Sequence, residues 1–254
     1  MAGKKKISEV QAPALDAEYW KHYSSEANPG IRDKLIFLTM GEISRRGILD
    51  VNGGAICEML EVKPPMINYY FGSFDGLLAE AIAKTYELWA EWTKVAISKR
   101  ARTPSARLKN FLNGEISRSR YYGTMVIFSA YPSLSEHVAR DLEEKFNERM
   151  ETIFEYTLAV IATLLNDLKT GTMTEISFTP ENFPSNKFKL TRTKELMAAA
   201  SVMWSISGLS LWATGQHGAT RRLSTIAGDI AEAAAISAHV DRIVASMESE
   251  FKSK

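Results

Sequence analysis

The 254-residue chain has one cysteine, Cys57, and no signal-peptide pattern at its N-terminus. A single cysteine excludes an internal disulfide and suits a reducing compartment. The first twenty residues include basic residues, but no apolar run follows them, so they do not resemble a secretory signal. We therefore expect a cytoplasmic protein whose stability comes from its packed core.

The sequence also lacks a charge excess and the motifs of common enzymes. It contains 31 Lys and Arg against 30 Asp and Glu, a formal net charge of +1, which excludes a uniformly basic polyanion binder. No glycine-rich phosphate loop, HExxH or GxSxG pattern occurs. The four histidines are scattered, without cysteines or carboxylates at metal-ligand spacing. We expect no catalytic residue, no metal site and no cofactor.

Residues 196–220 form the one long uncharged segment. Its length would suffice to cross a bilayer. However, Ala, Ser, Gly and Thr dominate it, and its hydrophobicity is modest. We interpret it as a helix buried within the protein rather than as a membrane span, and we expect no membrane partner.

Apolar residues recur at helical spacing along most of the chain, and strand signals are few. The fold class is therefore predicted as all-α. Asn28 is expected to cap the first helix, with Pro29 at its first position. Residues 169–194 read as a loop, or as a loop with a short β pair around residues 175–178. The expected helices cover approximately residues 28–47, 52–60, 64–72, 73–99, 103–120, 121–131, 134–168, 193–214 and 220–250.

The two short helices at residues 52–60 and 64–72 are joined by a tight turn, which is typical of a helix-turn-helix. Such a unit inserts the start of its second helix into the major groove of DNA. Apolar residues of this unit would face the first helix. The residues left pointing outward are Lys63, Met66, Asn68 and Tyr69. An asparagine can pair with adenine, a methionine can meet a thymine methyl group, and a lysine can reach a phosphate.

These residues carry a family resemblance. Residues 31–78 resemble the DNA-binding domain of the tetracycline-repressor-like (TetR) family of regulators. The positions in step with the family pattern are Gly47, Ile56, Val62, Ile67, Phe71, Ser73 and Leu77. The positions that depart from it are Glu61, Lys63, Asn68, Tyr70 and Phe74, which replace Gly, Ser, Tyr, His and Lys. Several of the replaced residues contact phosphates in the family.

The resemblance implies an N-terminal extension (residues 1–27), a helix-turn-helix domain (28–80) and a helical ligand-binding and dimerisation domain (81–254). It implies a homodimeric repressor that binds a palindromic DNA operator and is released by a small apolar or aromatic effector. The candidate DNA-binding residues are Asn52, Lys63, Pro65, Met66, Asn68, Tyr69 and Tyr70. The candidate residues lining the effector pocket are Trp89, Phe111, Tyr121, Met125, Phe128, Tyr156, Met203 and Trp204.

A second interpretation stays open. Residues 31–80 contain five Lys and Arg against seven Asp and Glu, a net charge of −2. Because DNA affinity depends largely on neutralised phosphates, this charge argues against tight binding. The chain would then keep the fold as a ligand-binding or protein-interaction module. The basic residues between positions 99 and 109 are expected to lie on a surface.

The last two predicted helices, at residues 193–214 and 220–250, are rich in alanine and serine. Small side chains allow helices to approach closely. We expect these helices to form a twofold homodimer through a four-helix bundle.

Overall fold

The computed structural model describes residues 15, 17–21, 23–24, 26–98, 100–122, 134–183, 193–214 and 219–252. The described residues form α-helices and one short 3-10 helix and contain no β-strand, which confirms the all-α prediction. The β pair expected around residues 175–178 is therefore wrong. Most of the helix expected at residues 121–131 lies outside the described residues.

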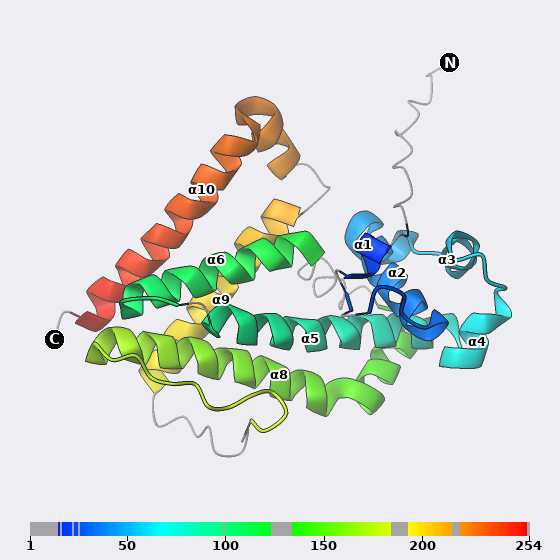
Figure 1. The fold of residues 1–254 in the computed structure, drawn as a ribbon, viewed down its shortest axis with the longest axis horizontal. Coiled ribbons are helices and arrows are strands. Elements are labelled where there is room, and N and C mark those ends of the chain that lie inside the picture. The colour runs from blue at the N-terminus through cyan, green and yellow to red at the C-terminus, as the bar shows by residue number, and fades with distance from the viewer. Residues whose placement is uncertain are drawn as a thin grey trace.

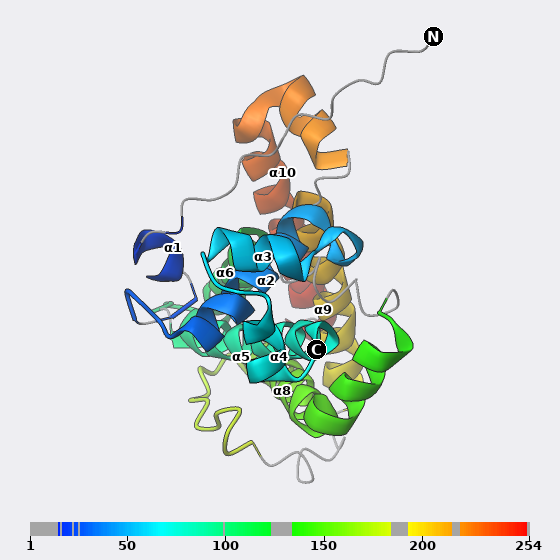
Figure 2. The same ribbon diagram turned by 90° about the vertical axis from the view of Figure 1, so that its right-hand side faces the viewer.

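Five elements gather at one end of the molecule, on the right of Figure 1. They are α1 (Ala17–Lys21), α2 (Ile31–Arg46), the 3-10 helix η1 (Ile48–Asp50), α3 (Gly53–Met59) and α4 (Pro65–Phe71). Figure 2 views this end directly and shows α3 and α4 facing outward, away from the long helices. A helix-turn-helix unit thus caps the end of an elongated helical body.

The body consists of α5 (Phe74–Ser98), α6 (Pro104–Tyr122), α8 (Glu136–Thr170), α9 (Thr193–Thr214) and α10 (Ala219–Lys252). Figure 1 shows α5 running from the helix-turn-helix end into the body, with α8 packed along it. Among the described residues, no helix is long and apolar enough to cross a membrane.

The helix ends agree with the sequence signals at two positions and differ at a third. Gly47 ends α2 with a φ of 85°, a conformation in which glycine is favoured. Ser73 caps α5 by accepting a hydrogen bond from the Gly76 N–H at 2.9 Å. The expected Asn28 cap is wrong. The Lys34 N–H donates to the Gly30 carbonyl at 2.9 Å, so the first helical hydrogen bond begins at Gly30.

Two hydrophobic cores lie along α5. The first joins α1–α4 and the start of α5 to the first turns of α8, where Val138 and Leu142 are buried. The second joins the remainder of α5 and α8 to α6, α9 and α10. Tyr86 packs against both cores. Since α5 contributes to both, a displacement in one core can be transmitted to the other along a continuous helix.

An ion pair holds the segment after α8 against the body. The Asp167 carboxylate is fully buried and lies 3.1 Å from Nη1 of Arg107. It also accepts hydrogen bonds from the backbone N–H (3.0 Å) and the hydroxyl (2.5 Å) of Thr174. Further along, the rings of Phe178 and Phe183 pack against Tyr156. The expectation that Arg107 decorates a surface is therefore wrong, because its partner is a buried carboxylate.

Candidate DNA-binding surface and ligand cavity

The turn between α3 and α4 has the backbone geometry of a tight helix-turn-helix. The Asn52 side chain caps α3, with Oδ1 accepting from the N–H groups of Gly54 (2.8 Å) and Ala55 (3.2 Å). The Val62 N–H then returns to the Cys57 carbonyl at 2.9 Å. Glu61 adopts a φ of 55°, a left-handed conformation that glycine adopts most readily. This is the position at which the resembled family has glycine.

Close packing also accounts for a second departure from the family pattern. A Cβ atom on Gly53 would lie 2.8 Å from the Phe74 ring and 3.0 Å from the Ile67 side chain. The start of α3 therefore rests directly on α4 and α5, with Phe74 as a packing residue. Where the family has a lysine, this chain has a half-buried ring in the first core.

The candidate DNA-binding residues divide by exposure. Ile56, Ile67 and Phe71 are buried, as expected for the inner face of the unit. The exposed candidates are Lys63, Pro65, Asn68 and Tyr69, and the half-buried ones are Met66 and Tyr70. Asn52 is also exposed, and its side chain caps α3. The outward residues therefore lie on α4 and the turn before it, on a face that no described element covers (Figure 2).

The arginines between residues 31 and 80 already have carboxylate partners in the same domain. Arg32 pairs with Glu80, and Arg45 and Arg46 share Glu42. Lys34 lies over the Trp20 ring and keeps its charge. Lys63 is exposed and has no ion pair among the described residues. Its ammonium group is thus available for a phosphate at the start of α4.

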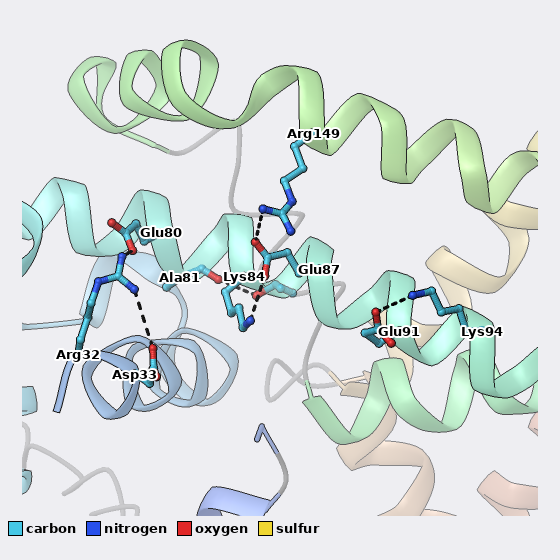
Figure 3. Close-up of polar contacts among 10 residues, drawn as sticks. Arg32, Asp33, Glu80, Ala81, Lys84, Glu87, Glu91, Lys94 and Arg149 are labelled. Atoms are coloured by element: carbon cyan, nitrogen blue, oxygen red, sulfur yellow. Dashed lines mark hydrogen bonds and ion pairs between the residues drawn. The ribbon is translucent and has the colours of Figure 1, made fainter. Parts of the chain in front are cut away.

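Ion pairs connect α5 to the elements on both sides of it (Figure 3). Arg32 of α2 pairs with Glu80 of α5. Two turns further along α5, Glu87 pairs with Lys84 at 2.9 Å and with Arg149 of α8 at 3.2 Å. The helix that follows the helix-turn-helix unit is therefore held to both α2 and α8.

A small cavity lies between α5, α6 and α9 in the second core. Its volume is about 10 Å³, the space of one water molecule. One part of its lining is polar and the other is apolar. The lining residues are Trp89, Glu115, Ser119, Met203, Ile206, Ser207 and Ser210.

The Glu115 carboxyl group is buried and hydrogen-bonded. Its Oε2 accepts from Nε1 of Trp89 at 2.8 Å, and its Oε1 accepts from the Thr93 hydroxyl at 3.2 Å. Burial raises the pKa of Glu115 to about 7, opposed by these two hydrogen bonds and by the charge of Arg118. After burial itself, the charge on Glu115 is among the causes that raise the pKa of Tyr156 on α8. The Glu115 carboxyl group titrates close to neutral pH.

We expect Glu115 to make the stability of the protein depend on pH. Between pH 4.5 and about 7, the folded protein holds a proton on Glu115 that the unfolded chain releases. The free energy of unfolding should therefore fall as pH rises through this window, by up to roughly 3 kcal/mol. Urea unfolding at about pH 5 and about pH 8 measures the fall, and Glu115→Gln should reduce it. An unchanged pH dependence in that variant would contradict the prediction.

The predicted pocket residues are only partly brought together. Trp89 and Met203 line the cavity. Phe111 and Tyr156 are fully buried in the same core but do not line it. Trp204 is 69% exposed on the outer face of α9, so its side chain does not face this cavity. Three candidate side chains lie outside the described residues: Tyr121, Met125 and Phe128.

Sequence reasoning missed Glu115 and the serines of the cavity. A lone glutamate amid apolar residues of a helix is a usable signal, because a charged residue at a core position needs partners. The serines carry no such signal. The described residues contain no cluster of His, Cys, Asp and Glu suited to a metal ion.

The fold is that of TetR-type transcriptional regulators, which confirms the resemblance at the level of fold. The chain is similar to a TetR regulator from Legionella pneumophila, with a TM-score of 0.55 and 12% identity, over 85% of this chain and 97% of that one. It is also similar to a transcriptional regulator from Rhodococcus sp., with a TM-score of 0.57 and 14% identity, over 85% of this chain and 97% of that one. For the TetR regulator PfmR from Thermus thermophilus, the TM-score is 0.53 and the identity 12%, over 84% of this chain and 97% of that one. No protein-family model and no curated protein matches the sequence.

Proposed function

We propose that the protein is a ligand-responsive transcriptional regulator, most simply a repressor, that binds a palindromic DNA operator as a homodimer. Residues 28–80 would form the DNA-binding domain and residues 81–254 the effector-binding and dimerisation domain. The observation that carries this proposal is the outward surface of α4 and of the turn before it, where Lys63, Asn68 and Tyr69 are exposed on a well-formed helix-turn-helix. The solved structures compared above are regulators with this fold.

The response to an effector would act through α5. This helix lines the cavity at Trp89, and its N-terminal end lies in the core of the helix-turn-helix unit. A ligand shifts an equilibrium only when it binds one conformation more tightly than the other. An effector that expands the cavity would displace α5, and the packing of the first turns of α5 against α4 would carry the displacement to the helix-turn-helix unit.

The dimer would form through α9 and α10. Four residues spaced along one face of α9 are exposed in the single chain: Met197, Ser201, Trp204 and Gly208. Met197 and Trp204 are 67% and 69% exposed, and a monomer rarely leaves such large apolar side chains in one stripe. Ala234, Ser237 and Ala238 give α10 an exposed face of small side chains. A second copy of the chain is the partner that covers both.

We expect Trp204→Glu to convert the dimer to a monomer, because it places a charge in the apolar centre of this interface. Sedimentation velocity at micromolar concentration measures the change. Phe154→Glu on α8 is a matched control, since Phe154 is also an exposed aromatic residue, at 40%. The dimer should survive that control. A monomeric wild-type protein, or a dimeric Trp204→Glu variant, would contradict the interface.

The proposed function is tested by titrating the purified protein against DNA from immediately upstream of its own gene at several salt concentrations. A dimeric operator reader should bind one palindromic site with a Kd on the order of 10⁻⁸ M or tighter and weaken steeply as salt rises. Weak binding that does not depend on sequence would support the alternative function. In that case the chain is a ligand-binding or protein-interaction module, which the net charge of −2 over residues 31–80 favours.

A further inference from the structure

The Glu115 carboxyl group keeps unused hydrogen-bonding capacity that faces the cavity. Each of its oxygens accepts one protein hydrogen bond, from Trp89 and from Thr93. An ionised carboxylate offers about four acceptor positions. Glu115 also lines the cavity itself. A hydrogen-bond donor placed in the cavity would therefore find an acidic acceptor already oriented by two neighbours.

Ser119 presents a second unsatisfied group on the same wall. It lies one helical turn after Glu115 on α6, on the same face of the helix. Its hydroxyl is buried, and it has no hydrogen-bond partner among the described residues. Such a group is costly to bury alone. Glu115 and Ser119 therefore face the same small space, which Ser207 and Ser210 of α9 also line.

The size and lining of the cavity restrict which ligand group binds there. About 10 Å³ accommodates a group of the size of one water molecule. A carboxylate repels anions and favours a cation. A primary ammonium has nearly the size of water and three N–H donors. The adjacent indole of Trp89 suits a cation as well, and Met203 and Ile206 provide apolar surface for the remainder of a ligand.

We propose that this cavity binds the ammonium group of a primary amine with an apolar or aromatic body. Glu115 supplies the charge partner, and Ser119 supplies a hydrogen-bond acceptor. Trp89, Met203 and Ile206 contact the apolar body as the cavity widens around it. This proposal rests on the proposed function, because the amine would be the effector of the regulator.

The test compares two probes of the same shape, phenethylamine and the neutral 2-phenylethanol, by isothermal titration calorimetry on the full-length protein at about pH 8, above the pKa of Glu115. Because a hydrogen bond to an ionised group is stronger than a neutral one, the amine should bind at least about tenfold more tightly. Glu115→Gln should abolish this preference. Glu144→Gln, on the exposed face of α8, is the matched control and should retain it.

Ser119→Ala keeps the proposal testable if Glu115→Gln fails to fold. Since the Ser119 hydroxyl has no partner among the described residues of the ligand-free protein, the variant should keep or slightly raise the melting temperature. It should nevertheless bind phenethylamine several-fold more weakly. A purely structural role for Ser119 would show the opposite pattern, with lower stability and unchanged affinity.

Three results would overturn the proposal: no binding of either probe, equal affinity for the two, or an amine preference that persists in Glu115→Gln. Operator binding measured on the same samples distinguishes a failure of the amine site from a failure of the proposed regulator function. DNA binding without amine binding would overturn the amine site alone. Amine binding without DNA binding would support the site and contradict the regulator function.

Discussion

Asp167→Ala should lower the free energy of unfolding by roughly 3–5 kcal/mol, the usual result of removing one partner of a buried ion pair. The carboxylate is fully buried, and the Arg107 side chain is 11% exposed. Removing Asp167 leaves this guanidinium short of a counter-charge. It also leaves the N–H and hydroxyl of Thr174 without their acceptor. Urea denaturation followed by circular dichroism measures the loss.

Asp241→Ala provides the control, because it also removes a carboxylate that pairs with a cation of α6. Asp241 pairs with Lys109, but its side chain is 52% exposed, so this loss should stay below about 1 kcal/mol. A double-mutant cycle with Arg107→Ala should show that the losses from Asp167→Ala and Arg107→Ala do not add. If Asp167→Ala were as mild as Asp241→Ala, the ion pair would not anchor the segment after α8.

The same variant, Asp167→Ala, should free the segment that the ion pair holds. Residues 172–183 have no regular secondary structure and lie against the body through Thr174, Phe178 and Phe183. With the Asp167 anchor lost, this segment should be cleaved by protease faster than in the wild-type protein. The Asp241→Ala control should be cleaved at the wild-type rate.

The helix-turn-helix was predictable because local signals and packing agree there. Asn52 and Ser73 are good caps by sequence and are caps in the structure. Pro65 opens α4, where the missing N–H has no cost. Gly47 stops α2 through its positive φ. Each feature depends on residues within a few positions of each other, so periodicity and capping preferences were sufficient.

The features that sequence reasoning missed depend on residues far apart in the chain. Arg107 and Asp167 are 60 positions apart, and neither position alone shows that the pair is buried. Glu115 meets Trp89 across 26 positions, and Ser119 lines the cavity with them only through the packing of α6 against α9. Trp204 illustrates the opposite error. Its aromatic ring suggested a pocket, but the register of α9 turns it outward.

The exposed face of α4 gives the second large expected effect. Lys63→Ala should weaken binding to operator and to unrelated DNA alike and should reduce the salt dependence by about one counterion. Asn68→Ala should cost about 1–3 kcal/mol on the operator and little on unrelated DNA, because a side chain that pairs with a base edge carries sequence information. Fluorescence anisotropy on both DNAs at several salt concentrations separates the two roles.

The controls come from α8, which carries the same residue types away from the proposed interface. Lys145 and Asn147 are outside the helix-turn-helix unit, so Lys145→Ala and Asn147→Ala should leave DNA affinity unchanged. Comparing these controls with the Lys63 and Asn68 variants also decides between a DNA-binding regulator and a ligand-binding or protein-interaction module. Because the arginines of this domain already pair with carboxylates, we expect Lys63 to supply a large share of the phosphate contact. If Lys63→Ala and Asn68→Ala both bind DNA like the wild type, α4 does not read DNA, and the chain functions through its ligand cavity or protein contacts.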